Sequence, residues 1–266
     1  MSGIRLYGRY VSLSLQSQMQ YRASFVMFAL ANGLSALLEF FATAALFARF
    51  GSLRGWALPE VALFYGMVHT AFALAEAAGR GFDVFHLHVR NGTFDRMMLR
   101  PRSTVLQVLG QDFQLLRVGR FAQGLFVLLW GAASLGMRWT AESVFLAVLS
   151  VVGGALLFSG LFVLQATLSF WSVEGLEIAN TLTYGGVEAA QFPLSIYRKW
   201  LREFFVFVVP IGCINYFPLI RILGRGDPLG YPGWAAWVSP AVGLGFFLVS
   251  LRVWGVGVRH YRSTGS

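Results

Sequence analysis

The stretch Ser143 to Phe170 reads SVFLAVLSVVGGALLFSGLFVLQATLSF and contains no charged residue. A helix of about 20 apolar residues is long enough to cross the hydrocarbon core of a bilayer. Five other apolar stretches of similar character cover roughly residues 23–48, 60–78, 118–135, 204–219 and 241–258. The sequence therefore predicts an all-α integral membrane protein with six transmembrane helices.

The overall composition agrees with this fold class. Hydrophobic residues make up 56% of the chain and charged residues only 12%, and the mean hydropathy is +0.62. These values exclude an ordinary soluble domain. The net charge of +9 would suggest nucleic acid in a soluble protein. Here the basic residues lie mostly at the ends of apolar stretches, so we expect them to set topology and to contact a lipid bilayer, with no nucleic-acid partner.

The distribution of basic residues also predicts the orientation. Six spans place both termini on one side of the membrane. With that side taken as cytoplasmic, the segment 171–202 is cytoplasmic too, and thirteen basic residues lie inside against five outside. Arg198, Lys199 and Arg202 are among the thirteen. The excess favours both termini in the cytoplasm.

The segment before the first span has its own helical pattern. Ile4, Tyr7 and Val11 recur at helical spacing, and Arg5 and Arg9 belong to a polar stripe displaced around the helix. We expect residues 1–22 to form an amphipathic helix in the membrane interface, followed by one transmembrane domain over residues 23–266. The alternative is that this helix extends the first span into the cytoplasm.

Several kinds of chemistry are absent from the sequence. The only lysine, Lys199, lies between Arg198 and Trp200, so no phosphate-binding loop for ATP exists. His86 and His88 have no further metal ligands nearby. We therefore expect no catalytic group, no metal site and no cofactor bound by this chain.

Two carboxylates within predicted spans are candidate residues of a translocation path. Burial of a charge in hydrocarbon is costly and usually has a functional or structural reason. Glu39 lies in the outer half of the first span without a basic residue within a turn or two. Glu76 lies near the inner end of the second span, where an ion pair is the structural alternative, as it is for Asp112 near Arg117.

The segment between the second and third spans, Gly81 to Arg102, is a candidate contact for a soluble partner. Phe82, Phe85 and Val89 are spaced to line one side of a short helix, and Asn91-Gly92 is a strong helix stop. We expect the two phenylalanines to be gripped by that partner. The alternative is a loop that rests on lipid.

Residues 90–101, RNGTFDRMMLRP, carry a resemblance to a known family. A basic residue, a glycine, an aspartate and an Arg-Pro pair resemble the signature that follows the second span of ABC-2 type transporter permeases, especially a bacterial branch of about 260 residues. This assigns a role in ATPase coupling to Arg90, Gly92, Asp95, Arg96, Arg100 and Pro101, beside Phe82, Phe85 and Val89. Further stretches that resemble the branch are Gln20 to Arg22, Ser169 to Trp171 with Glu174, Leu182 to Gly186, Phe192 to Tyr197, Asn215 to Pro218 and Tyr261 to Ser266.

The resemblance implies one membrane half of an ATP-driven exporter in the bacterial cytoplasmic membrane. A coupling helix would lie between spans two and three, and a partly re-entrant segment between spans five and six. ATP and Mg would be bound by a separate ATPase subunit, and a second permease, identical or related, would complete the transporter. A secondary transporter or channel that uses Glu39 and Glu76, and a non-transporting membrane scaffold, are the alternatives. The sequence leaves open the substrate and whether residues 221–240 re-enter the bilayer.

Overall fold

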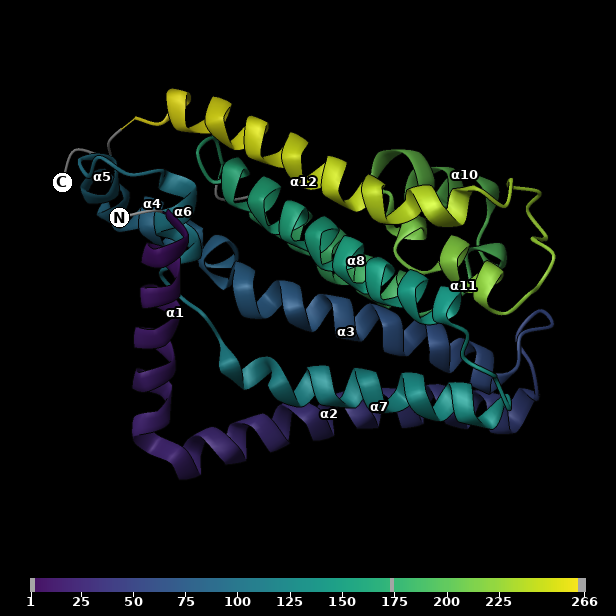
Figure 1. The fold of residues 1–266 in the computed structure, drawn as a ribbon. Coiled ribbons are helices and arrows are strands. Elements are labelled where there is room, and N and C mark those ends of the chain that lie inside the picture. Colours follow the sequence, from purple (N-terminus) through teal and green to yellow (C-terminus); the bar gives the residue numbers. More distant parts are fainter. Residues whose placement is uncertain (1–2, 173–174, 263–266) are drawn as a thin grey trace.

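The computed structural model describes residues 3–172 and 175–262, and within these ranges the protein is helical without a β-strand. The long helices run along the long axis of the molecule (Figure 1). They are α2 (Arg22–Phe50), α3 (Leu58–Asp83), α7 (Val118–Ser134), α8 (Ala141–Leu168), α9 (Gly175–Ala190) and α12 (Ala235–His260). Both termini lie at the same end of this bundle, which we call the terminal end, and the opposite end is the distal end.

Five of these helices coincide with predicted spans. Among the described residues, α2, α3, α7, α8 and α12 each belong to a helix that is long and apolar enough to cross a membrane. The predicted span 143–170 corresponds to α8, for example, and the predicted span 241–258 lies within α12. The sixth prediction, 204–219, does not correspond to a straight helix.

Residues 204–219 belong instead to a bent pair of helical arms. The first arm contains α10 (Lys199–Glu203) and a π-helical turn at Phe204–Val208, and the second contains a 3-10 turn at Ile211–Cys213 and α11 (Tyr216–Ile222). The arms meet at 75°. The break falls at Pro210, which lacks a backbone N–H and restricts the residue before it.

Both flanks of the bent pair lie at the distal end. The indole of Trp56, in the connection between α2 and α3, donates a hydrogen bond to Ser195 Oγ over 3.0 Å, and Arg225 donates to the Gly55 carbonyl over 2.9 Å. The pair therefore begins and ends near the distal end. The family resemblance instead implied a re-entrant segment after the predicted span 204–219, so the segment that turns back comes earlier in the chain than expected. The prediction that the basic residues before it lie on the same side as the two termini was wrong, because they lie at the distal end. When Arg198, Lys199 and Arg202 are counted at the distal end, ten basic residues lie at the terminal end and eight at the distal end.

Helix α9 lies in the segment between the predicted fourth and fifth spans and is not among the helices that are long and apolar enough to cross a membrane. Tyr184 on this helix reaches Asp83 near the terminal end of α3, and the carbonyl of Ala190, its last residue, accepts a hydrogen bond from Asn215 in the bent pair. With 16 residues, α9 is shorter than α2, α3, α7, α8 and α12. It escaped prediction because polar residues such as Thr183 and Glu188 interrupt its apolar pattern.

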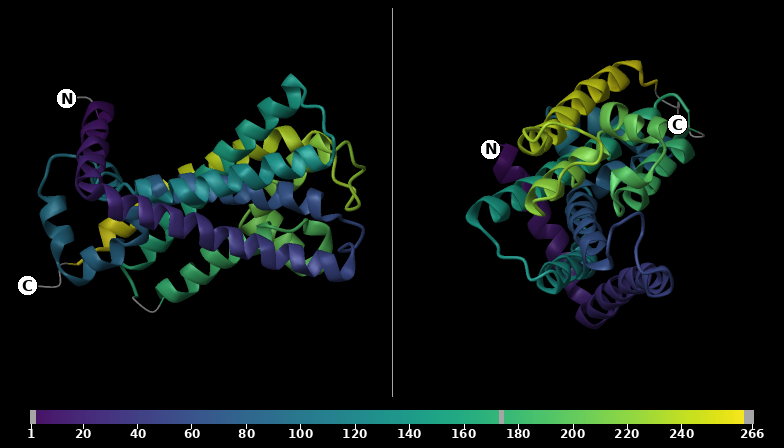
Figure 2. Two further views of the ribbon diagram at one scale, coloured as in Figure 1. Left: turned by 90° about the horizontal axis from the view of Figure 1, so that it is seen from below. Right: turned by 90° about the vertical axis from the view of Figure 1, so that its right-hand side faces the viewer.

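Helix α1 (Gly3–Gln18) lies across the terminal end and is separated from α2 by a 3-10 turn at Met19–Tyr21 (Figures 1 and 2). Ser14 and Gln18 both donate hydrogen bonds to the carbonyl of Phe113, and Gln18 accepts one from the Leu115 backbone. Helices α1 and α2 thus run in different directions, and the location of α1 in the membrane interface stays a prediction.

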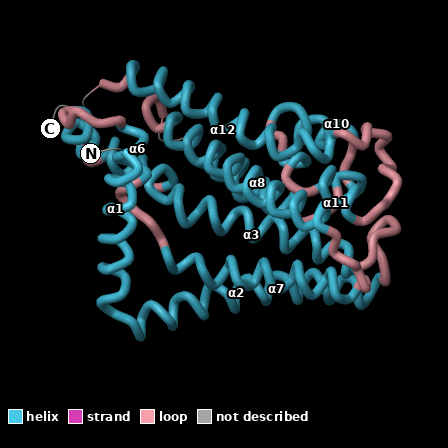
Figure 3. The backbone as a smooth tube through the Cα atoms, in the orientation of Figure 1, coloured by secondary structure: helices cyan, strands magenta, loops and turns pink. Residues whose placement is uncertain are grey.

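Three short helices also lie at the terminal end, where loops gather as they do at the distal end (Figure 3). They are α4 (Phe85–Arg90), α5 (Thr93–Met98) and α6 (Thr104–Leu109). A 3-10 turn at Leu115–Arg117 follows them. One further 3-10 turn, at Leu194–Ile196, precedes the bent pair. The predicted helix stop at Asn91-Gly92 is confirmed. Gly92 separates α4 from α5 and has a φ of 63°, a conformation that glycine adopts without strain.

Glycine allows two pairs of traversing helices to approach backbone to backbone. A side chain at Gly66 of α3 would collide with the backbone of Leu128 on α7. A side chain at Gly243 of α12 would overlap the carbonyl of Gly153 on α8. Such small-residue contacts are the usual means of close helix packing in membranes.

Candidate functional site

The connection between α3 and α6 is fixed to the bundle by aromatic residues. We call six residues the aromatic cluster: Phe82, Phe85, Phe94, Phe170, Trp254 and Tyr261. Phe85 lies at its centre, with ring centroids 4.8 Å from Trp254, 5.0 Å from Phe94 and 5.3 Å from Phe170. The cluster thus joins α4 and α5 to the terminal ends of α8 and α12.

This arrangement corrects the expectation for Phe82 and Phe85. They are 1% and 0% exposed, because Phe82 in the last turn of α3 and Phe85 at the start of α4 both face the bundle. Neither ring is available to a soluble partner in this structure. Amphipathic spacing identified the apolar side correctly but could not tell what covers it.

The exposed surface of the connection has a different composition. Arg90, Arg96, Arg100 and Pro101 are exposed, and Leu99 is 85% exposed. Val89, Gly92 and Asp95 are half-buried. We call Arg90, Arg96 and Leu99 the outer surface of the connection. It offers positive charge around one prominent apolar side chain.

Hydrogen bonds hold the connection in addition to the rings. Gln107 on α6 donates to the carbonyls of Met97 and Arg102, over 3.0 Å and 3.2 Å. The Trp254 indole donates to Thr104 Oγ1 over 3.1 Å. Burial and the Asp95 carboxylate beside its hydroxyl raise the pKa of Tyr261 to about 12. The connection therefore forms one body with the end of α12.

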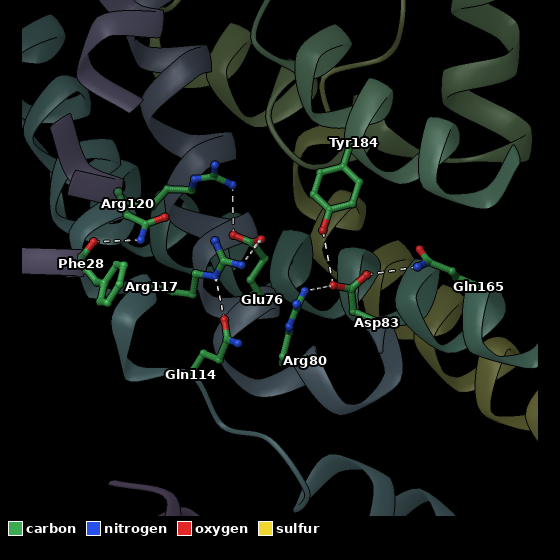
Figure 4. Close-up of polar contacts among 10 residues, drawn as sticks. Phe28, Glu76, Arg80, Asp83, Gln114, Arg117, Arg120, Gln165 and Tyr184 are labelled. Atoms are coloured by element: carbon green, nitrogen blue, oxygen red, sulfur yellow. Dashed lines mark hydrogen bonds and ion pairs between the residues drawn. The ribbon is translucent and has the colours of Figure 1, made fainter. Parts of the chain in front are cut away.

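A cluster of charged side chains lies inside the terminal half of the bundle, on α3, α7 and the segment that leads into α7 (Figure 4). Glu76, whose side chain is 4% exposed, forms ion pairs with Arg117 over 3.3 Å and Arg120 over 3.0 Å. The ion-pair alternative for Glu76 is thereby confirmed. Asp112 forms no ion pair with any described residue.

The second part of the charged cluster surrounds Asp83. Its carboxylate pairs with Arg80 and accepts hydrogen bonds from Gln165 of α8 over 3.1 Å and from Tyr184 of α9 over 3.4 Å (Figure 4). Asp83 thus connects α3 to two other helices. The sequence reasoning missed this role, although an acidic residue one turn after Arg80 was a visible signal.

Glu39 does not face the interior of this chain. It is exposed on α2, which lies at the edge of the bundle in the right-hand view of Figure 2. A further acidic residue, Glu188 on α9, accepts a hydrogen bond from Gln191 over 2.8 Å. Glu188 was missed because its segment was expected to lie outside the membrane. The family-motif residues Glu174 and Ser263 to Ser266 lie outside the described residues.

Helices of membrane-spanning length and a buried charged cluster define a multi-pass membrane protein. A sequence model described as ABC-2 family transporter protein matches residues 34–265, and the chain belongs to this family. No curated protein and no solved structure matches the chain. ABC-2 permeases are membrane components of ABC transport, and the family implies association with an ABC ATPase and often with a second permease.

Proposed function

We propose that the chain is the permease subunit of an ATP-driven exporter. A separate ATPase binds at the terminal end, which faces the cytoplasm of a bacterial cell, and its closure on ATP and Mg drives a substrate outward. Family membership supports this proposal, and the absence of a phosphate-binding loop agrees with ATP hydrolysis in another subunit.

The observation that carries the proposal is the attachment of α4 and α5 to the aromatic cluster. Closely packed interiors have low compressibility and transmit displacement. A force on the outer surface of the connection therefore reaches α12 through Phe85 and Trp254, and α8 through Phe170. Contact with the ATPase is made by Arg96 and Leu99, which are exposed, and not by the buried phenylalanines.

A second permease completes the transporter in this proposal. A carboxylate left in hydrocarbon is costly, so Glu39 is expected to face the partner permease or a path between the two halves. Glu76 stabilises the bundle through its two arginines. It therefore gives little support to a secondary transporter built around a free buried carboxylate.

The test is a comparison of ATP hydrolysis by the purified chain alone, by the ATPase encoded beside it, and by the two reconstituted together in nanodiscs. We expect no hydrolysis by the chain alone, co-purification of the two subunits, and a higher rate for the complex. Robust hydrolysis by the chain alone would contradict the proposal. So would an ATPase that neither binds the chain nor changes its rate in its presence.

A further inference from the structure

A cavity of about 650 Å³ lies at the terminal end, between α1, α6 and the segment that leads into α7. On one side it is lined by Tyr10, Leu13 and Ser17 of α1. The opposite wall contains Arg100, Gln107 and Asp112. The ring of Tyr10 lies directly against Gly110, so the two walls touch at one edge of the cavity.

Three polar groups in the opposite wall lack partners. Neither Arg100 nor Asp112 forms an ion pair with any described residue, and they do not pair with each other. Gln107 is only 3% exposed, and its Oε1 accepts no hydrogen bond although its Nε2 donates two.

The chemistry of these groups defines the ligand. Arg100 suits a phosphate group, and Asp112 suits a group that carries several N–H donors and a positive charge. Phosphate and a primary ammonium occur together in phosphoethanolamine. Leu13, which is 63% exposed, and Leu116 supply an apolar margin at the same cavity.

We propose that this cavity binds the headgroup of a phosphatidylethanolamine-type lipid. A lipid is favoured over a soluble molecule because one wall is the amphipathic helix α1, whose exposed apolar side chains suit the acyl boundary of a bilayer. The bound lipid joins α1 to α6 and thus to the connection that contains α4 and α5. This site is independent of the proposed transport activity and needs no ATPase.

The test is native mass spectrometry of the detergent-solubilised full chain titrated with three lipids of identical acyl chains. Phosphatidylethanolamine is compared with phosphatidylcholine, which keeps the charge but has no N–H donor, and with phosphatidylglycerol. We expect roughly tenfold tighter binding of phosphatidylethanolamine than of phosphatidylcholine, because hydrogen bonds to charged groups are lost in the second lipid.

Variants separate the two parts of the headgroup. Asp112→Asn should remove the preference over phosphatidylcholine, and Arg100→Gln should weaken both lipids by a similar factor. The matched controls are Glu177→Gln and Arg259→Gln, two exposed residues that do not line the cavity. If a charge variant fails to fold, Ser17→Trp fills the cavity from the exposed side of α1. Ser12→Trp, exposed on the same helix and outside the cavity lining, is its control.

Three results would overturn the proposal. They are equal affinity for phosphatidylethanolamine and phosphatidylcholine, a preference for phosphatidylglycerol, and a preference that survives both Asp112→Asn and Ser17→Trp. Displacement of the lipid by free phosphoethanolamine at comparable concentration would also overturn it and would assign the cavity to a soluble ligand. The binding measurements contain no ATPase, so their failure leaves the proposed transport function untouched.

Discussion

The indole ring of Trp254 lies edge-on against the ring of Phe85, with 4.8 Å between the centroids and 72° between the planes. The first residue of α4 is thereby in direct contact with the last traversing helix. This contact makes the connection between α3 and α6 a part of the bundle and not a separate appendage. Its consequences can be measured separately on the buried side and on the exposed side.

On the buried side, Phe85→Ala should destabilise the chain. Removal of a buried aromatic ring leaves a cavity and typically costs about 3–5 kcal/mol. The thermal midpoint in detergent should therefore fall clearly, and less so for Phe85→Leu. Leu87→Ala is the control, since Leu87 lies on the same helix and is 44% exposed. Equal midpoints for Phe85→Ala and Leu87→Ala would show that the aromatic cluster does not hold the connection.

On the exposed side, Leu99→Asp and Arg96→Glu should weaken recovery of the neighbouring ATPase in a pull-down. Substitutions of exposed side chains usually change stability by no more than about 0.5 kcal/mol. The thermal midpoint of the free chain should thus stay unchanged. Arg138→Glu, at an exposed position of the distal end, is the control. Full recovery of the ATPase by the double variant would place the contact elsewhere.

Glu76→Gln should be strongly destabilising. It leaves Arg117 and Arg120 without their carboxylate partner, and breaking a buried ion pair on one side typically costs about 3–5 kcal/mol. Added Arg120→Gln should restore part of the loss, because fewer unpaired charges remain. Glu203→Gln is the control, since that side chain is 53% exposed. A thermal midpoint for Glu76→Gln that matches the control would argue against these ion pairs.

Two glycines in α12 provide a matched test of helix packing. Gly243→Ala would force a methyl group against Gly153, whereas Gly245→Ala points into open space. Overpacking typically costs about 1–3 kcal/mol, so only the first variant should lower the thermal midpoint. Gly245→Ala should be neutral or slightly stabilising, since alanine favours the helix. A reversed order would show that α8 and α12 do not approach as described.

The re-entrant placement of the bent pair predicts opposite labelling of two exposed residues. In a variant with Cys213→Ser, Arg96→Cys should react with a membrane-impermeant thiol reagent from one side only, and Lys199→Cys from the other. Cys213 is buried, and the Lys199 side chain is 81% exposed. Reaction of both positions from the same side of oriented vesicles would restore a cytoplasmic location for the segment before the bent pair.

The sequence predicted most of the fold because hydropathy and length are local properties. An uncharged run such as Ser143 to Phe170 requires burial in lipid or protein wherever it lies. Helix α9 was missed because it carries Glu188 and several threonines, and its apolar side can be recognised only from its packing against α3 and α8. The uninterrupted apolar run around Pro210 resembled a span more closely than α9 does.

The candidate site was predicted less completely. Glu76 and its arginines are separated by about 40 residues, so the sequence identified the charges but not their pairing. For Phe82 and Phe85, the spacing indicated one apolar side of a short helix. Whether that side faces a partner or the same chain depends on Phe170 and Trp254, which belong to distant helices.

The glycine contacts at Gly66 and Gly243 have a mechanical consequence. Where two backbones touch, one helix cannot bend without displacing the other. The pairs α3 with α7 and α8 with α12 are therefore each expected to move as one rigid unit. A displacement applied at the terminal end is then carried to the distal end by a pair of helices and is not absorbed by the curvature of one. The bent pair around Pro210 is held mainly at the distal end. It would therefore be the last part of the molecule to move.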